Sequence, residues 1–344
     1  MAPTAPMAPT APMAPTASGS SQLILTVTRA CNLRCSYCPT AKEGWPSLTV
    51  EQARAAVALF DERYGGGTIK LFGGEPLLVP DVVRAVLDEG RHRPRVRWIQ
   101  LSTNGLGLDR AWLQRLGSHP KAILTLSLDG GPRAHRRHRR ALPGVADAYD
   151  HVLSLLPQLL RTPRVGVTQV IAPATAAAAA ENLAHLRSLG FYRFNLLPGY
   201  YLPWRPEQLE ALEVGLARIE LQLRAAWASG ERLHLRNLFT RAPTPFFNTG
   251  VVVDADGSIH PSNVGLSGQL DGLRGRTQVG TLDDPPTQAT LQQHASRINA
   301  MLAEVLPERI WASTQAVDRL LTELCRRLYR PWLAARRARL SGIA

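Results

Sequence analysis

The stretch TRACNLRCSYC, residues 28–38, contains three of the four cysteines in this 344-residue chain. Cys31, Cys35 and Cys38 are separated by three residues and then by two, so three thiols lie within eight positions. A thiolate binds soft and borderline metals, and three thiolates in one short loop indicate a shared metal site. The stretch therefore predicts a metal centre that is built from a single loop.

Three kinds of site could use three cysteines in one loop. A structural zinc ion takes four protein ligands, commonly from paired cysteines or histidines, and the sequence offers no second pair at that spacing. Isolated reactive thiols would not explain three cysteines together. A [4Fe–4S] cluster normally takes four thiolates, so three from the protein would leave one iron open to an exogenous ligand. We favour the iron–sulfur cluster.

The first 200 residues alternate short apolar runs with longer helical patterns. Such alternation indicates parallel βαβ units, and glycine or polar motifs follow several of the runs, where parallel barrels place their active sites. We therefore expect an α/β fold, a partial (β/α)6 TIM-like barrel. Its strands are predicted at residues 23–28, 68–72, 97–102, 122–128, 164–171 and 192–198.

The rest of the chain predicts two smaller parts. Residues 1–20 repeat MAPTAP and lack the residues of a core, so we expect a disordered tail. The segment VVVDADGSIHPS, residues 251–262, reads as a β-hairpin, and residues 287–340 read as mostly amphipathic helix. The predicted domains are the barrel at 21–235 and a small C-terminal β-hairpin plus helical module at 236–344.

The Cys-x3-Cys-x2-Cys pattern in a loop after the first strand resembles the signature of the radical SAM superfamily, with Tyr37 at the aromatic position before the last cysteine. GGEPLL, residues 73–78, resembles the GGE motif of that superfamily. DGGPRAHRRHR, residues 129–139, resembles a stretch of its SPASM/Twitch branch, which often modifies peptides. The resemblance covers residues 22–200 firmly and the remainder loosely.

The resemblance implies two cofactors, one [4Fe–4S] cluster bound by the three cysteines and S-adenosylmethionine (SAM). It implies that Gly73, Gly74 and Glu75 hold the methionine end of SAM and that Tyr37 lies near its adenine. Ser127 and Arg139 would contact the ribose and carboxylate, and a guanidinium suits a carboxylate because the two pair bidentately. Asn104 and Gln169 are looser candidates for the same cofactor. His135 and His138 are expected to be surface or turn residues as readily as site residues.

Departures from the branch also carry predictions. Ser262 and Asn263 stand where relatives usually have a cysteine, and no cysteine cluster occurs in the C-terminal third, so auxiliary clusters are expected to be absent. Cys325 is a candidate hydrogen donor to a substrate radical, by analogy with peptide epimerases, although a lone helical cysteine is more often a packed residue.

Charge and patterning limit the partners. The formal net charge of +13 would attract acidic partners, but the charge is scattered and no RNA-binding motif occurs, so a nucleic-acid partner is not favoured. No apolar run is long enough to span a bilayer, which predicts no membrane partner. Few, bunched cysteines fit a reducing, cytoplasmic setting.

The resemblance implies reductive cleavage of SAM to a 5′-deoxyadenosyl radical that abstracts a hydrogen atom from a substrate. A reducing donor such as flavodoxin or ferredoxin would supply the electron. We favour a ribosomally synthesised peptide or a protein side chain as substrate. A small biosynthetic metabolite and RNA are the alternatives, and intact cysteine and GGE motifs argue against a non-catalytic binding protein.

Overall fold

The computed structural model describes residues 22–240 and 249–341. Within these residues ten strands form one sheet in the order β12-β11-β10-β1-β3-β4-β5-β7-β8-β9. Pairing is parallel from β10 to β9, and β11 and β12 are added antiparallel at one edge. The strands are β1 Gln22–Thr28, β3 Gly67–Gly73, β4 Val96–Thr103, β5 Ala122–Ser127, β7 Val165–Ile171, β8 Arg193–Pro198, β9 His234–Leu235, β10 Thr249–Val253, β11 Ser258–Ser262 and β12 Gly280–Thr281.

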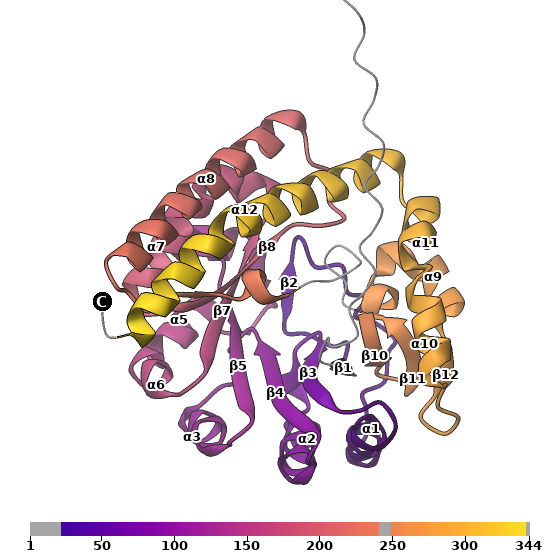
Figure 1. Cartoon of the computed structure of the whole chain (residues 1–344). Coiled ribbons are helices and arrows are strands. Elements are labelled where there is room, and N and C mark those ends of the chain that lie inside the picture. Colours follow the sequence, from indigo (N-terminus) through magenta and orange to yellow (C-terminus); the bar gives the residue numbers. More distant parts are fainter. Residues whose placement is uncertain (1–21, 241–248, 342–344) are drawn as a thin grey trace, which may run out of the picture.

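The six predicted barrel strands are confirmed, each within one residue at either end. Their side chains are largely buried because helices cover one face and the opposite face encloses the interior of the partial barrel. Parallel strands covered in this way are continuously apolar, which is why they could be recognised in the sequence. The observed fold is the predicted α/β partial TIM-like barrel with an added hairpin and helices (Figure 1).

Helices follow the barrel strands and pack on the outer face of the sheet. The first of them begins at Thr49, whose side chain accepts a hydrogen bond from Gln52 N while Gln52 Oε1 accepts from Thr49 N, as the predicted capping box requires. The helices of the barrel are α1 Val50–Arg63, α2 Pro80–His92, α3 Arg110–Ser118, α4 Pro132–His138, α5 Ala148–Ser154, α6 Leu156–Arg161, α7 Ala179–Ser188 and α8 Pro206–Ala228.

The C-terminal hairpin is part of the barrel sheet. β10 and β11 form the predicted hairpin, and β10 pairs in parallel with β1, with Leu23 opposite Val251. The segment after residue 235 therefore continues the sheet on the far side of the first barrel strand. The division into domains at this residue stays a prediction, and the predicted tail, residues 1–20, lies outside the described residues.

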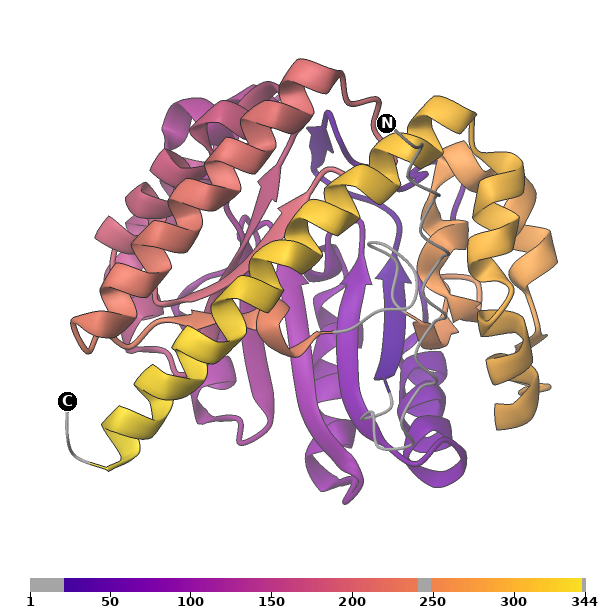
Figure 2. The same ribbon diagram turned by 45° about the horizontal axis from the view of Figure 1, so that its top comes forward.

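The predicted C-terminal helical region contains three helices after α9 Asp271–Thr277, namely α10 Gln288–Ala295, α11 Ile298–Val305 and α12 Glu308–Leu340. α12 runs from the group formed by α9, α10 and α11 at one edge of the sheet to α8 at the other (Figures 1 and 2). Arg327 on α12 pairs with Glu220 on α8 at 2.6 Å. None of the described helices combines the length and apolar character that a bilayer-spanning segment needs.

Candidate metal and cofactor site

The cysteine loop leaves the C-terminal end of β1 and is held by backbone hydrogen bonds. Within the loop, the short strand β2 Leu33–Cys35 pairs antiparallel with β6 Arg139–Ala141, with Cys35 opposite Arg139. Ser36 N donates to His138 O at 2.9 Å, and Cys38 N donates to Cys35 O at 3.1 Å. The basic run at residues 135–140 thus forms the end of α4 and a strand that clamps the loop.

Gly73 and Gly74 are required by contact between β3 and the start of the cysteine loop. A Cβ atom at Gly74 would lie 2.1 Å from Ala30 O. A Cβ atom at Gly73 would lie 2.1 Å from Thr28 O, and Gly73 also has a positive φ of +131°. Gly74 N donates to Thr28 O at 2.9 Å and Glu75 N donates to Ala30 O at 2.8 Å. The glycines allow close approach to the protein's own backbone, and their predicted contact with SAM stays a prediction.

Glu75 is a buried carboxylate with three donors. Its Oε1 accepts from Leu77 N at 3.0 Å and from Thr103 Oγ1 at 2.7 Å, and its Oε2 accepts from Asn104 N at 2.7 Å. Burial raises the pKa of Glu75, and these hydrogen bonds oppose the rise. Among the described residues Oε2 accepts only the hydrogen bond from Asn104 N, whereas a carboxylate oxygen can accept two, and Glu75 lines the pocket.

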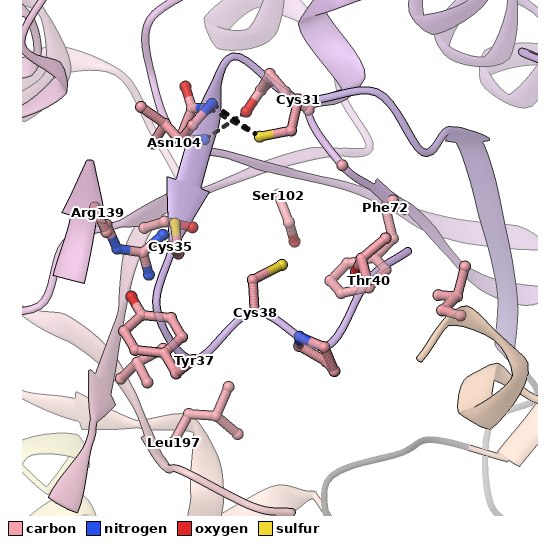
Figure 3. A pocket seen from close by; sticks show the side chains of 18 of the residues that line it. Cys31, Cys35, Tyr37, Cys38, Thr40, Phe72, Ser102, Asn104, Arg139 and Leu197 are labelled. Carbon is pink, nitrogen blue, oxygen red and sulfur yellow. Dashed lines mark hydrogen bonds between the residues drawn. The ribbon is translucent and has the colours of Figure 1, made fainter. Parts of the chain in front are cut away.

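The three cysteines line one cavity of about 150 Å³ together with the GGE motif. Figure 3 shows their side chains around a common space, with Phe72 entering from β3 and Ser102 from β4. The structure also brings most of the predicted cofactor residues into this lining: Tyr37, Gly73, Gly74, Glu75, Asn104, Ser127 and Arg139. The cavity thus joins the predicted metal ligands with the predicted SAM contacts.

Arg139 makes a buried ion pair within this lining. Its Nε and Nη2 donate to Asp129 at 3.1 and 3.0 Å, and Tyr37 Oη donates to the same carboxylate at 2.5 Å. Burial lowers the pKa of Arg139, but the Asp129 carboxylate outweighs that effect and the net pKa is raised. The guanidinium therefore stays charged, with Nη1 left over for a further acceptor.

Burial favours the protonated form of two of the thiols, Cys35 and Cys31. It raises the pKa of Cys35 to about 11 although Arg139 opposes the rise, and it raises the pKa of Cys31 as well. Metal binding requires the thiolate, so loading this site would release protons.

The arrangement of donors fits a cluster better than a single ion. In the described parts of the chain, no three His, Cys, Asp or Glu side chains converge as one metal ion would require. Zinc–sulfur bonds of about 2.3 Å would draw three sulfurs tightly together. Each cysteine of a [4Fe–4S] cube binds a different iron, so the sulfurs surround a body larger than one ion, and the three cysteines of this chain line one cavity.

Four of the candidate site residues named from the sequence do not line the cavity. Gln169 is buried, does not line the cavity and donates from Nε2 to Ala179 O at 3.0 Å. His135 and His138 are not surface residues: both are buried, with the His135 ring centre 5.6 Å from that of Tyr149 and His138 Nδ1 2.7 Å from Ser36 Oγ. Cys325, on α12, does not line the cavity, and burial followed by Asp318 raises its pKa to about 11.

Several lining residues carried no recognisable sequence signal. Ser102 lies near the end of β4, at the start of the STNG stretch, residues 102–105. Lys42 lies shortly after Cys38 in the sequence, and Tyr200 lies shortly after the end of β8. Leu266 comes from the C-terminal region, and only the pairing of β10 with β1 brings it here.

A sequence profile described as the radical SAM superfamily matches residues 25–159, the stretch that holds the cysteine loop, the GGE motif and the β2–β6 clamp. Residues 25–159 are a radical SAM domain. The radical SAM superfamily uses a [4Fe–4S] cluster and SAM.

Curated relatives match the same part of the chain. GTP 3′,8-cyclase 2 of Mycobacterium tuberculosis is 35% identical over 144 residues, which are 38% of this chain and 39% of that protein. Molybdenum cofactor biosynthesis protein 1 of Homo sapiens is 38% identical over 115 residues, 32% of this chain and 18% of that protein. The chain thus spans less than half the length of these relatives.

Solved structures match the radical SAM domain and the parts that follow it. The structure of native anSMEcpe with bound AdoMet and Cp18Cys peptide has a TM-score of 0.70 at 17% identity, covering 92% of this chain and 99% of that one. Streptococcus suis SuiB bound to precursor peptide SuiA has a TM-score of 0.56 at 12% identity, covering 76% and 62%. At these identities the similarity concerns the fold.

Proposed function

We propose that this protein is a radical SAM enzyme that abstracts a hydrogen atom from a peptide or protein side chain. The observation that carries the proposal is one cavity in which three cysteines of a single loop face a buried carboxylate with an open acceptor position. When bound, the reduced cluster and SAM supply the electron and the sulfonium from which a 5′-deoxyadenosyl radical forms.

Each cavity residue has a proposed task. Cys31, Cys35 and Cys38 bind three irons. Glu75 accepts a hydrogen bond from the SAM ammonium at the free position of Oε2, where a buried carboxylate gains from a cation. Arg139, oriented by Asp129, offers Nη1 to the carboxylate of SAM.

Other residues place the nucleoside and exclude water. Ser127 and Tyr37 line the cavity, and Arg139 lies over the Tyr37 ring, which suits contacts with the ribose and the adenine. Phe72, Leu197 and Leu266 give the cavity apolar walls. A dry cavity keeps solvent away from a reactive radical.

A peptide substrate is supported by the fold over nearly the whole chain, since the anSMEcpe structure that it resembles is described with a bound peptide. A flavodoxin or ferredoxin is the proposed electron donor. We also propose a reducing, cytoplasmic setting, which is consistent with all four cysteines being free thiols.

A small metabolite is the second candidate substrate. It is favoured by the relatives in sequence, among them a GTP 3′,8-cyclase, although the matched stretch is only 38% of this chain. RNA is the third candidate substrate, and only the net positive charge favours it. RNA binding that weakens steeply with added salt would support this candidate.

The proposed reaction is tested by measuring 5′-deoxyadenosine from SAM with anaerobically reconstituted, reduced protein. We expect formation by the wild type, none by Cys35→Ala, and formation by the matched variant Cys325→Ala, which removes the cysteine outside the loop. Equal formation by Cys35→Ala and wild type would refute the proposal. The same assay tests the substrate class by comparing how much peptides and nucleotides each increase the formation of 5′-deoxyadenosine. An increase with nucleotides alone would favour the small metabolite.

A further inference from the structure

The cysteine sulfurs differ in their hydrogen-bond donors. Cys31 Sγ accepts from Leu33 N at 3.4 Å and lies 4.0 Å from Asn104 Nδ2, both neutral donors. Cys38 Sγ accepts from the ammonium of Lys42 at 3.2 Å. Within the described ranges, Lys42 is the only cationic side chain that donates a hydrogen bond to a cysteine sulfur.

The charge of Lys42 is not neutralised by an ion pair within the described residues. The other cation of the cavity, Arg139, is paired with Asp129 at 3.0 Å. Among residues 22–240 and 249–341, no carboxylate pairs with Lys42, and the neighbouring Glu43 side chain is exposed. Lys42 therefore adds a net positive charge beside Cys38.

The position of Lys42 is set by the fold. Its Nζ also donates to Thr40 O at 3.2 Å, which anchors the side chain independently of the sulfur. The backbone before it is clamped, because Ala41 N donates to Leu266 O at 3.0 Å and Gly268 N donates to Pro39 O at 2.9 Å. Figure 3 shows Thr40 on the same short segment as Cys38, at the edge of the cavity.

We propose that Lys42 raises the reduction potential of the cluster by holding its ammonium beside the sulfur of Cys38. The inference rests on the proposed function, because it assumes that the three cysteines bind a cluster. An added electron makes the cluster and its thiolates more negative, and a fixed cation stabilises that state. Hydrogen bonds to the sulfurs and local charge are known determinants of cluster potential.

The test is an anaerobic redox titration of the reconstituted full-length protein, followed by electron paramagnetic resonance (EPR). For Lys42→Met we expect a lower midpoint potential, with a reduced-to-oxidised ratio at fixed potential about tenfold lower, which is 59 mV for a one-electron couple. Lys42→Arg keeps the charge and should stay near the wild type. Glu43→Gln, the matched control, removes an exposed charge one residue away and should shift the potential less.

Several outcomes separate this inference from the proposed function. If the wild type binds no iron, the proposed function itself fails. If the wild type holds a cluster and Lys42→Met has the same midpoint potential, only the role of Lys42 is refuted. Weaker SAM binding at an unchanged potential would also overturn that role, because Lys42 would then hold the ligand. Where Lys42→Met retains no iron, Lys42→Gln, a donor without charge, replaces it in the titration.

Discussion

Arg29, two residues before Cys31, forms a buried ion pair with Asp254 in the turn of the C-terminal hairpin, 225 residues further along the chain. Arg29 Nε donates to Asp254 Oδ1 at 3.1 Å, and the guanidinium lies 3.6 Å from the ring centre of Trp45. The pair fixes the start of the cysteine loop to the hairpin. The described part of the C-terminal region therefore holds the start of the candidate metal-binding loop in place.

Asp254→Ala should destabilise the protein by roughly 3–5 kcal/mol, because the fully buried Arg29 would lose its carboxylate. Denaturant unfolding measures the loss, and iron retention after reconstitution should fall with it. The control is Glu304→Ala, which removes the carboxylate of the exposed pair with Arg276 and should leave the unfolding midpoint almost unchanged. Equal effects of the two variants would contradict a supporting role for the Arg29–Asp254 pair.

Gly74→Ala should displace the cysteine loop. The added Cβ would lie 2.1 Å from Ala30 O, and overpacking of this kind costs about 1–3 kcal/mol. We expect lower iron content and a lower unfolding midpoint. Gly272→Ala, where a Cβ meets nothing within 4 Å, should change neither. A Gly74→Ala protein with full iron content would show that the close approach of β3 to the loop is dispensable.

Much of this architecture could be predicted from the sequence, because the signals are local. Continuous apolar runs and the glycines after them locate the barrel strands, and the Cys-x3-Cys-x2-Cys spacing locates the metal site. Asn104 is predicted because the carboxyl ends of parallel strands meet at one edge of a barrel, and Ser127 is implied by the resemblance to the radical SAM superfamily.

The remaining features depend on pairing between distant segments. No local pattern indicates that β10 pairs with β1 or that Leu266 forms a wall of the cavity. No local pattern shows that Arg139 and Arg140 pair with β2 or that His135 is buried. Gln169 was chosen for its place in a strand, but its side chain turns to Ala179 O.

Acid should destabilise the protein through His135. Burial, followed by the charge of Arg139, lowers the pKa of His135 to about 4, whereas the unfolded chain protonates near pH 6.5. The unfolded state therefore binds the proton first, and stability is lost as pH falls from about 6.5 to 4, at up to about 1.4 kcal/mol per pH unit for one histidine. The free energy of unfolding across this range measures the effect.

Replacing His135 by Phe should reduce the slope of the free energy of unfolding against pH by the amount that corresponds to about one proton. His92→Gln, at an exposed histidine at the end of α2, is the control and should leave the slope unchanged. An unchanged slope in His135→Phe would mean that His135 is not the neutral buried group.

The central claim is that three cysteines bind a [4Fe–4S] cluster with one iron open to SAM. The most direct measurement is metal analysis of anaerobically reconstituted protein, combined with EPR of the reduced form before and after SAM is added. We predict about four irons per chain and a spectrum that changes with SAM, because SAM binds the open iron. Zinc at these thiols, or a cluster whose spectrum ignores SAM, would contradict the account.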